Sequence, residues 1–428
     1  MEKDKLLHEI HLNLNVRGLK QSATLLINEH SNQLIREGKQ VYKLGLGQSP
    51  FPVPAIVVKS LQDHAAEKDY LAVKGLLALR QSIAGFYKRH WDIDYAVDNI
   101  IIGPGSKELL FLLQLVYYGE LIIPTPSWVS YAPQAKIIGR NIFWVPTRKE
   151  NFWRLTPEEL DKICRHDPHR PRLLILNYPS NPTGYTYKQD ELSELAKVAR
   201  KYKVVLVSDE IYGMLDHEGD HHSISTLYPE GTIISGGLSK WCGAGGWRLG
   251  ALAFPESLDW LANALAIAAS ETFTSTSAPI QYAGVTAFEP HEEIESYLRR
   301  AQKILKVLGR ACNRILNQAG IQNPDPHGGF YLFPDFSAYR ERFQAKDIHD
   351  SETMCRRMLE ECRVATLPGS EFGRSPYEYT LRLSYVNFDG TAAIQAAAVE
   401  EVDEQFIQTH CGETLKAVQA MIDWIRSL

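Results

Sequence analysis

The chain is poor in the features that mark membrane, secreted and nucleic-acid-binding proteins. No run approaches the roughly 20 apolar residues that a membrane-spanning helix needs, so we expect no membrane partner. Residues 1–16 are charged and lack the apolar core of a secretory signal. With 46 basic against 51 acidic residues the net charge is −5, and we expect no basic surface for nucleic acid.

Cysteine is also sparse. The 6 cysteines among 428 residues include no Cys-x-x-Cys pair, so we expect free thiols in a reducing compartment and a cytoplasmic location. The run Asp-His-Glu-Gly-Asp-His-His at residues 216–222 contains potential metal ligands. Its polarity and its glycine favour a solvated loop instead, and we expect no metal site. The sequence shows no repeat or low-complexity tract, which excludes a solenoid.

Short apolar runs alternate with amphipathic stretches through the middle of the chain. Candidate strands cover residues 100–102, 121–123, 173–176, 204–208, 232–235 and 249–253. Residues 107–118 and 189–202 have helical patterns, and Thr156 to Glu159 form a capping box at the start of another helix. This alternation predicts an α/β fold with a mostly parallel sheet covered by helices on both faces.

After about residue 310 the pattern changes, and residues 330–333 and 380–385 are candidate strands of a smaller unit. The amphipathic stretch at residues 22–38 is expected to pack with that unit. We therefore predict a large domain of residues 46–309 and a smaller, discontinuous α+β domain of residues 1–45 and 310–428.

Lys240 is the first candidate for chemistry. It lies in a glycine-rich segment, Ser-Gly-Gly-Leu-Ser-Lys-Trp-Cys-Gly-Ala-Gly-Gly-Trp-Arg, from Ser235 to Arg248. A lysine with a lowered pKa forms an imine with an aldehyde, and arginine offers planar donors suited to phosphate. Taken alone, the segment is better explained as an exposed loop that carries incidental basic residues, because glycine-rich loops with a basic residue are common.

Three further motifs each follow a candidate strand. They are Asn-Tyr-Pro-Ser-Asn-Pro-Thr-Gly at residues 177–184, Ser-Asp-Glu-Ile-Tyr at 208–212 and Gly-Pro-Gly-Ser-Lys at 103–107. A structural turn, a helix N-cap and a plain tight turn are the respective alternatives. An aromatic such as Trp128, after another strand, is more often a core residue than a stacking platform when it is taken alone. Ligands of open parallel sheets bind beyond the carboxyl ends of the strands, so we expect these motifs to converge.

In this order and spacing the motifs resemble the fold-type I aminotransferases, specifically the class I/II aspartate/aromatic aminotransferase family. The resemblance runs from about residue 44 to residue 385 and includes Pro-Gly-Ser-x-Phe-Gly at 368–373, Gly-Phe-Tyr-Leu-Phe-Pro at 329–334 and Arg-Leu-Ser-Tyr at 382–385. It implies a large domain with a seven-stranded sheet that binds pyridoxal 5′-phosphate (PLP). It also implies an amino-acid:2-oxo-acid aminotransferase that works by ping-pong transamination.

The resemblance assigns catalytic roles to Lys240, Asp209 and Tyr212. Lys240 would form a Schiff base with PLP and then move the α-proton of the substrate. Asp209 would face the pyridine nitrogen and keep it protonated. Tyr212 and Asn181 would bind the phenolic oxygen of the cofactor, and Trp128 would stack on its ring.

The remaining implied residues hold the phosphate and the substrate. The residues that would bind the phosphate are Gly105, Ser106, Lys107, Ser239 and Arg248. Tyr70 matches a tyrosine that reaches the phosphate of a neighbouring subunit, which implies a homodimer with shared active sites. Arg382 would bind the substrate carboxylate, with Asn181 and Gly47 beside it.

Two departures from the family and two rival functions remain open. The family often has a hydroxyl residue where this chain has Gly237, and Ser235 or Ser239 would have to replace it. The loop at residues 272–279 lacks the arginine of one dicarboxylate-specific subgroup. A PLP-dependent lyase or synthase, such as a carbon–sulfur lyase or an aminocyclopropanecarboxylate-synthase-like enzyme, shares these motifs. A non-catalytic PLP-binding regulator is disfavoured, because the segment before Gly47 is too short for an added winged-helix domain. The amino donor, the acceptor and the pathway are not set by these motifs.

Overall fold

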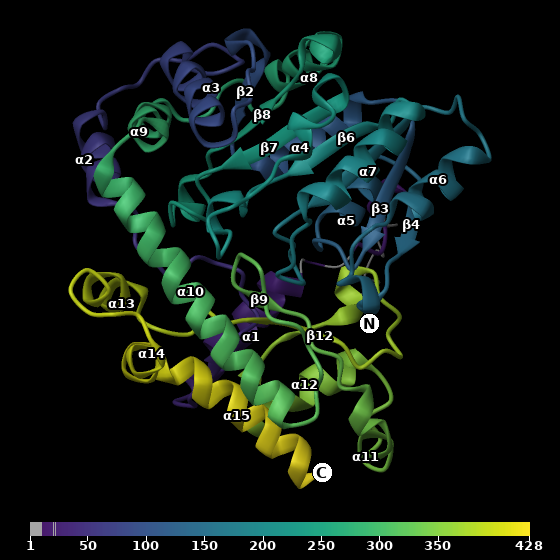
Figure 1. Cartoon of the computed structure of the whole chain (residues 1–428), viewed down its shortest axis with the longest axis vertical. Helices are drawn as coiled ribbons and strands as arrows, with labels where there is room; N and C mark the ends of the chain where they lie inside the picture. The colour runs from purple at the N-terminus through teal and green to yellow at the C-terminus, as the bar shows by residue number, and fades with distance from the viewer. Residues whose placement is uncertain (1–10, 20, 22) are drawn as a thin grey trace, which may run out of the picture.

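The computed structural model describes residues 11–19, 21 and 23–428, and Figure 1 shows a large part built on one central sheet above a smaller part. Residues 1–10, on which part of the small-domain and signal-sequence expectations rest, lie outside the described residues. The domain limits at 45/46 and 309/310 remain a prediction. The second limit lies within the long helix α10 (Glu292–Gln318), which packs on elements of both parts.

The central sheet has seven strands in the order β2-β8-β7-β6-β5-β3-β4. Its strands are β2 (Ile100–Gly103), β3 (Glu120–Thr125), β4 (Ile142–Pro146), β5 (Arg172–Asn177), β6 (Val205–Asp209), β7 (Thr232–Gly237) and β8 (Gly250–Ala253). Only β8 runs antiparallel to its neighbours β2 and β7, so the predicted seven-stranded, mostly parallel sheet is confirmed. The sequence patterns missed the edge strand β4, in which Phe143 and Trp144 are exposed and no buried apolar run marks the strand.

Helices cover both faces of the sheet because successive strand side chains point to opposite sides. Leu173 and Ile175 of β5 pack with the helices α4, α5 and α8, whereas Leu174 and Leu176 pack with α6 and α7 on the other face. The helices of the large part are α2 (Ala55–Asp63), α3 (Leu77–Trp91), α4 (Ser106–Val116), α5 (Tyr131–Ile137), α6 (Pro157–Arg165), α7 (Gln189–Lys201), α8 (Asp259–Ser270) and α9 (Ala278–Phe288).

The predicted capping box opens α6. The Thr156 side chain accepts from the Glu159 amide at 3.3 Å, and the Thr156 amide donates to Glu159 Oε2 at 3.0 Å. Two otherwise unpaired donors at the start of the helix are satisfied in this way. The local sequence therefore determines where α6 begins.

The smaller part contains two small sheets and helices from both ends of the chain. Strand β1 (Tyr42–Lys43) pairs with β10 (Val364–Ala365), and β11 (Leu367–Pro368), β12 (Leu381–Ser384) and β9 (Tyr331–Leu332) form an antiparallel sheet. The helices are α1 (Ala23–Arg36), α11 (Arg340–Gln344), α12 (Ser351–Cys362), α13 (Gly390–Ala396), α14 (Glu404–His410) and α15 (Gly412–Ser427). Ile27 of α1 packs on a cluster that includes Leu359 and Ala365, so the amino-terminal helix does pack with this part.

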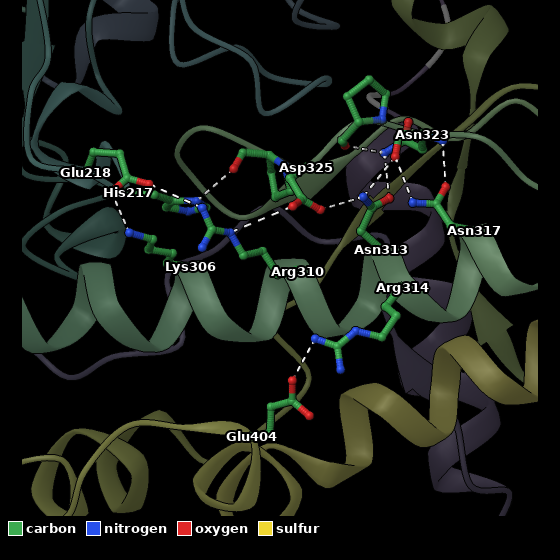
Figure 2. A network of polar contacts seen from close by, with 12 residues as sticks. His217, Glu218, Lys306, Arg310, Asn313, Arg314, Asn317, Asn323, Asp325 and Glu404 are labelled. Atoms are coloured by element: carbon green, nitrogen blue, oxygen red, sulfur yellow. Dashed lines mark hydrogen bonds and ion pairs between the residues drawn. The ribbon is translucent and has the colours of Figure 1, made fainter.

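The segment of residues 323–329, called the strap below, connects α10 to the small sheet and is held to α10 by polar contacts. Asn313 of α10 donates to the Asn323 carbonyl and to Asp325 Oδ1, both at 2.8 Å, and Arg310 lies 3.8 Å from Asp325 (Figure 2). These contacts hold residues 323–329, the segment directly before β9. Helix α10 thereby fixes the approach of β9 to the large part.

The run at residues 216–222 is only in part the solvated loop expected from its polarity, because residues 218–220 are exposed and its ends are not. Asp216, His217 and His221 are buried. The ring nitrogens of His217 lie 3.1 Å from the Pro326 carbonyl and 3.0 Å from the Gly329 carbonyl, and His221 Nε2 lies 2.9 Å from Glu210 Oε2. For these three residues the expectation was wrong, because the partners of the histidines come from other segments of the chain, which no local pattern reveals. Among the described residues no group of three or more His, Cys, Asp or Glu side chains is placed to hold a metal, and none of the described helices is long and apolar enough to cross a membrane.

Candidate active site

The predicted motifs meet beyond the carboxyl ends of the central strands. Asn177 ends β5 and Asp209 ends β6, while Lys240 follows β7 after a short loop. Arg382 enters from β12 of the smaller part, 201 residues away from Asn181, with which it forms a hydrogen bond. The candidate site, called the crevice below, therefore takes residues from both parts.

Lys240 is the partly buried amine of this crevice. Its Nζ donates to the Gly47 carbonyl at 2.6 Å and lies 5.7 Å from the centre of the Tyr212 ring. Burial lowers the pKa of Lys240 to about 8, and the cations Arg382 and Arg248 add to the effect. A larger fraction of neutral amine is thus present near neutral pH than for an ordinary lysine.

Asp209 is a buried carboxylate with one unsatisfied oxygen. Its Oδ2 accepts from the Tyr131 hydroxyl at 2.5 Å, while Oδ1 has no partner. Burial raises the pKa of Asp209 to about 6. A buried acceptor without a donor is costly, so this oxygen requires a ligand group that can donate a proton.

Arg382 and Asn181 form the second polar centre. Arg382 is only 1% exposed, and its Nη1 donates to Asn181 Oδ1 at 3.0 Å while Nη2 donates to the Gly45 carbonyl at 2.5 Å. Its Nε is buried without an acceptor. An unpaired donor on a buried cation favours an anionic ligand such as a carboxylate.

The segment from Gly105 to Lys107 forms an open cationic cup with Arg248. Gly105 has a φ of 88° at the start of α4, and a Cβ there would lie 2.2 Å from Arg248 Nη2. The first-turn amides of α4 have no helical acceptors and carry the positive end of the helix dipole. Lys107 and Arg248 are exposed here, and Lys107 Nζ lies 5.8 Å from the centre of the Trp128 ring. Amides and cations together make a site for a phosphate.

Neither Tyr70 nor Ser239 is joined to this cluster by a hydrogen bond or ion pair within the described chain. Tyr70 is 90% exposed, and Ser239 is partly buried beside Lys240. Gly237 cannot bear the hydroxyl side chain that the family often has there, because a Cβ would lie 2.6 Å from the Leu249 carbonyl. Ser235, the alternative, is fully buried; its hydroxyl makes no hydrogen bond of normal geometry, but it lies near enough to Asp209 to lower the pKa of that carboxyl.

Comparisons with known proteins agree with this geometry. The sequence model described as "Aminotransferase class I and II" matches residues 39–397. The chain is 32% identical to an aspartate aminotransferase of Bacillus subtilis, over 92% of this chain and 98% of that protein. It is 30% identical to an asparagine–oxo-acid transaminase of Streptococcus mutans, over 87% of this chain and 94% of that protein.

Solved structures show the same relationship. Aspartate aminotransferase from Thermus thermophilus with maleate superposes with a TM-score of 0.83 at 26% identity, covering 97% of this chain and 99% of that one. The aromatic aminotransferase of Pyrococcus horikoshii gives a TM-score of 0.78 at 26% identity, covering 93% and 99%. The chain belongs to the class I and II aminotransferase family.

This aminotransferase uses PLP, as its family does, and its crevice fits that cofactor. The free Oδ1 of Asp209 suits a protonated pyridine nitrogen, and the Gly105 cup suits a phosphate. The lowered pKa of Lys240 suits an amine that must react with an aldehyde. The three groups sit in one crevice, so the residues present fit the cofactor.

Sequence reasoning missed two hydroxyls of the aminotransferase site. Tyr131 bonds to Asp209, and it lies three residues after Trp128, with which its ring makes a T-shaped contact at 5.1 Å. Tyr331 bonds to Tyr212 and lies in the Gly-Phe-Tyr-Leu-Phe-Pro segment that carried part of the resemblance. Tyr131 lies close to the predicted Trp128, and Tyr331 lies inside a family motif. This closeness to predicted site residues was the only signal in the sequence that could have identified them.

Proposed function

We propose that the chain is an amino-acid:2-oxo-acid aminotransferase in which Lys240 binds the cofactor and moves the substrate α-proton. The observation that carries this proposal is the Lys240 amine, with a pKa of about 8, in a crevice shared with the Asp209 carboxylate and the Arg382 guanidinium. Alternating use of an amino acid and a 2-oxo acid by one site gives ping-pong kinetics. The related proteins are named as transferases, which favours this function over the lyase, synthase and regulator alternatives.

Binding and orientation are divided among the other residues. Asp209 holds a proton on the pyridine nitrogen, Tyr212 and Asn181 donate to the phenolic oxygen, and Trp128 covers the ring. The phosphate is held by the residues of the cup, which are Gly105, Ser106, Lys107, Ser239 and Arg248. When bound, PLP supplies an electron-withdrawing ring that spreads the negative charge left on the substrate carbon after proton removal.

Substrate binding depends on Arg382, which donates bidentately to the α-carboxylate, with Asn181 and Gly47 beside it. This anchor aims the α-hydrogen of the substrate at the Lys240 amine. The neutral fraction of that amine removes the proton, and the resulting ammonium returns one, so a single group acts as base and then as acid.

Aspartate is the first donor to test, since several related proteins are named as aspartate aminotransferases. That the enzyme selects aspartate by its side chain is likewise a proposal. The loop at residues 272–279 still lacks an arginine, so selection of a dicarboxylate would depend on other cations of the crevice.

A homodimer with shared sites completes the proposal. Tyr70 is 90% exposed, Ile267 of α8 is 70% exposed, and Leu77 and Trp260 are also exposed. Lys74 Nζ donates to Asn263 Oδ1 at 3.0 Å, which ties the segment before α3 to α8 and places these apolar side chains on adjoining elements. Such a surface supports a contact with a second copy, from which Tyr70 would reach the other phosphate cup. A cytoplasmic location is proposed from the sequence alone.

A panel of amino acids tests the function. The visible absorbance of the bound cofactor should fall on addition of a substrate amino acid and return on addition of a 2-oxo acid. Lys240→Ala should lower kcat/KM by more than about 10²-fold, as expected for a general acid–base. Lys197→Ala, which changes an exposed lysine paired with Glu194, is the matched control. Wild-type turnover by Lys240→Ala, or release of ammonia without any oxo acid, would refute the proposal.

A further inference from the structure

The Tyr331 hydroxyl lies at the centre of the crevice. Tyr331 is fully buried in β9, and its hydroxyl oxygen lies 2.7 Å from the Tyr212 hydroxyl oxygen and 3.5 Å from Asn181 Nδ2. A Cβ at Gly47 would lie 2.2 Å from the same hydroxyl. Gly47 is therefore a glycine because Tyr331 occupies the space in which a side chain would stand.

Two hydroxyls 2.7 Å apart share one hydrogen, and the residue that donates it determines where the other proton points. If Tyr212 donated to Tyr331, its own oxygen would present only lone pairs to a ligand. If Tyr331 donates to Tyr212, the Tyr212 proton is free to point at a ligand oxygen. The identity of the donor thus decides whether Tyr212 is a hydrogen-bond donor in the site.

We propose that Tyr331 is a positioning residue, whose hydroxyl donates to Tyr212 and so directs the Tyr212 proton toward the phenolic oxygen of the cofactor. This inference rests on the proposed function, in which Tyr212 binds that oxygen. Tyr331 itself need not touch the cofactor. It acts through Tyr212.

The surroundings favour Tyr331 as the donor of the pair. Asn181 Nδ2 donates to the Tyr331 oxygen, which occupies one of its lone pairs. The Arg382 guanidinium carbon lies 4.8 Å from the centre of the Tyr331 ring, and this cation opposes the rise that burial causes in the pKa of Tyr331. Burial raises the pKa of Tyr212 well above its usual range, and the neighbouring Tyr331 raises it further by more than Arg382 lowers it. The more acidic phenol is the better donor.

The backbone keeps Tyr331 in this position. A Cβ at Gly184 would lie 2.4 Å from the Tyr331 carbonyl, so the turn that carries Asn181 packs directly on β9. The strap at residues 323–329, which Asn313 holds from α10 (Figure 2), leads into this strand. Tyr331, Tyr212 and Asn181 are therefore fixed relative to one another by the contact between the two parts.

Tyr331→Phe removes only the hydroxyl, and a spectroscopic pH titration of the PLP-loaded protein measures the result. In this variant Tyr212 keeps its proton but loses the partner that polarises and orients it, so its hydrogen bond to the phenolic oxygen weakens. A phenolic oxygen with a weaker donor carries more negative charge and holds the proton that it shares with the Lys240 nitrogen more tightly. We expect the midpoint of the pH-dependent change in visible absorbance to rise by roughly 0.3–0.5 pH unit, about half of what the loss of one neutral hydrogen bond would cause. The dissociation constant of PLP, measured on the apoprotein, should rise about twofold to threefold for the same reason.

Tyr212→Phe and the double variant separate positioning from a structural effect. If Tyr331 acts through Tyr212, the double variant should titrate like Tyr212→Phe, with no further shift from the second change. Tyr117→Phe is the matched control, since it removes a buried hydroxyl that donates to the Arg172 carbonyl at 3.1 Å, at the other end of the strands. Its titration should equal that of the wild type.

The outcomes distinguish the inference from the proposed function. A wild-type midpoint in Tyr331→Phe, or additive shifts in the double variant, would overturn the positioning role while leaving Lys240 as the binding lysine. A wild-type protein that bound no PLP at Lys240 would instead refute the proposed function. Circular dichroism of each variant establishes that the titrated proteins are folded.

Discussion

Asp209→Asn should stabilise the protein without cofactor and impair the protein with cofactor. The wild-type carboxylate is 3% exposed, and its Oδ1 has no partner. Burial raises its pKa from 3.8 in the unfolded chain to about 6 in the folded one. Asparagine has nearly the same shape and keeps an acceptor for the Tyr131 hydroxyl, but it carries no charge.

The magnitude follows from linkage between proton binding and folding. A folded-state pKa that is raised means that the folded protein binds the proton more tightly, so the carboxylate costs nothing at low pH. The cost appears as the pH rises from about 4 to about 6 and is complete above that range. A rise of about two units corresponds to about 3 kcal/mol at pH 8, of which less than about 1 kcal/mol remains at pH 4.

The assay is thermal unfolding of the apoprotein at matched concentration, at pH 8 and pH 4. For a chain of this length, 3 kcal/mol corresponds to a Tm difference of roughly 3 °C. We expect the Tm of Asp209→Asn relative to wild type to rise by roughly 2–3 °C between pH 4 and pH 8, because part of the cost is already present at pH 4. With PLP bound the order should reverse, because the wild-type charge then faces a protonated nitrogen and the asparagine does not.

Two results would refute this reasoning. An Asp209→Asn apoprotein whose Tm relative to wild type does not change between pH 4 and pH 8 would show that the buried charge of Asp209 does not destabilise the apoprotein. A variant that binds PLP as tightly as the wild type would show that Asp209 does not face the cofactor. Tyr131→Phe provides a check, since removal of the hydroxyl that donates to Oδ2 should raise the cost of the charge further.

Two other predictions concern the substrate and the dimer. Arg382→Lys keeps the charge but loses the bidentate fork, so kcat/KM for an amino acid should fall about 10- to 100-fold, by steady-state kinetics, while the affinity for PLP is retained; an unchanged kcat/KM would exclude Arg382 as the carboxylate anchor. Tyr70→Phe should raise the dissociation constant of PLP about tenfold through loss of a hydrogen bond to phosphate, measured by fluorescence titration. Mixed dimers of Tyr70→Phe with Lys240→Ala subunits should regain one site of wild-type affinity for PLP, because the intact lysine of one subunit then meets the intact tyrosine of the other. Mixed dimers without such a site would contradict shared active sites.

Much of the fold was predictable because its signals are local. The buried strands β2, β5 and β6 are short apolar runs bounded by turn residues, and the start of α6 is specified by Thr156 and Glu159. Strand β4 escaped detection because a half-exposed edge strand has no such pattern. The pattern of apolar residues indicates a strand where the strand is buried, but it gives no clear indication where the strand is only partly buried.

The sequence by itself determined the family and the identity of most of the candidate site, since Lys240, Asp209, Asn181 and Arg382 lie in motifs that can be read one at a time. Only the tertiary structure decided how these residues are partnered. The Tyr212–Tyr331 contact joins residues 119 positions apart, and the pair that Arg382 forms with Asn181 spans 201. Such contacts depend on how the smaller part packs against the sheet, and no local pattern encodes that geometry. For the same reason, the pKa of Lys240 and the unpaired oxygen of Asp209 are properties of the folded crevice, where burial sets the free energy of each charge.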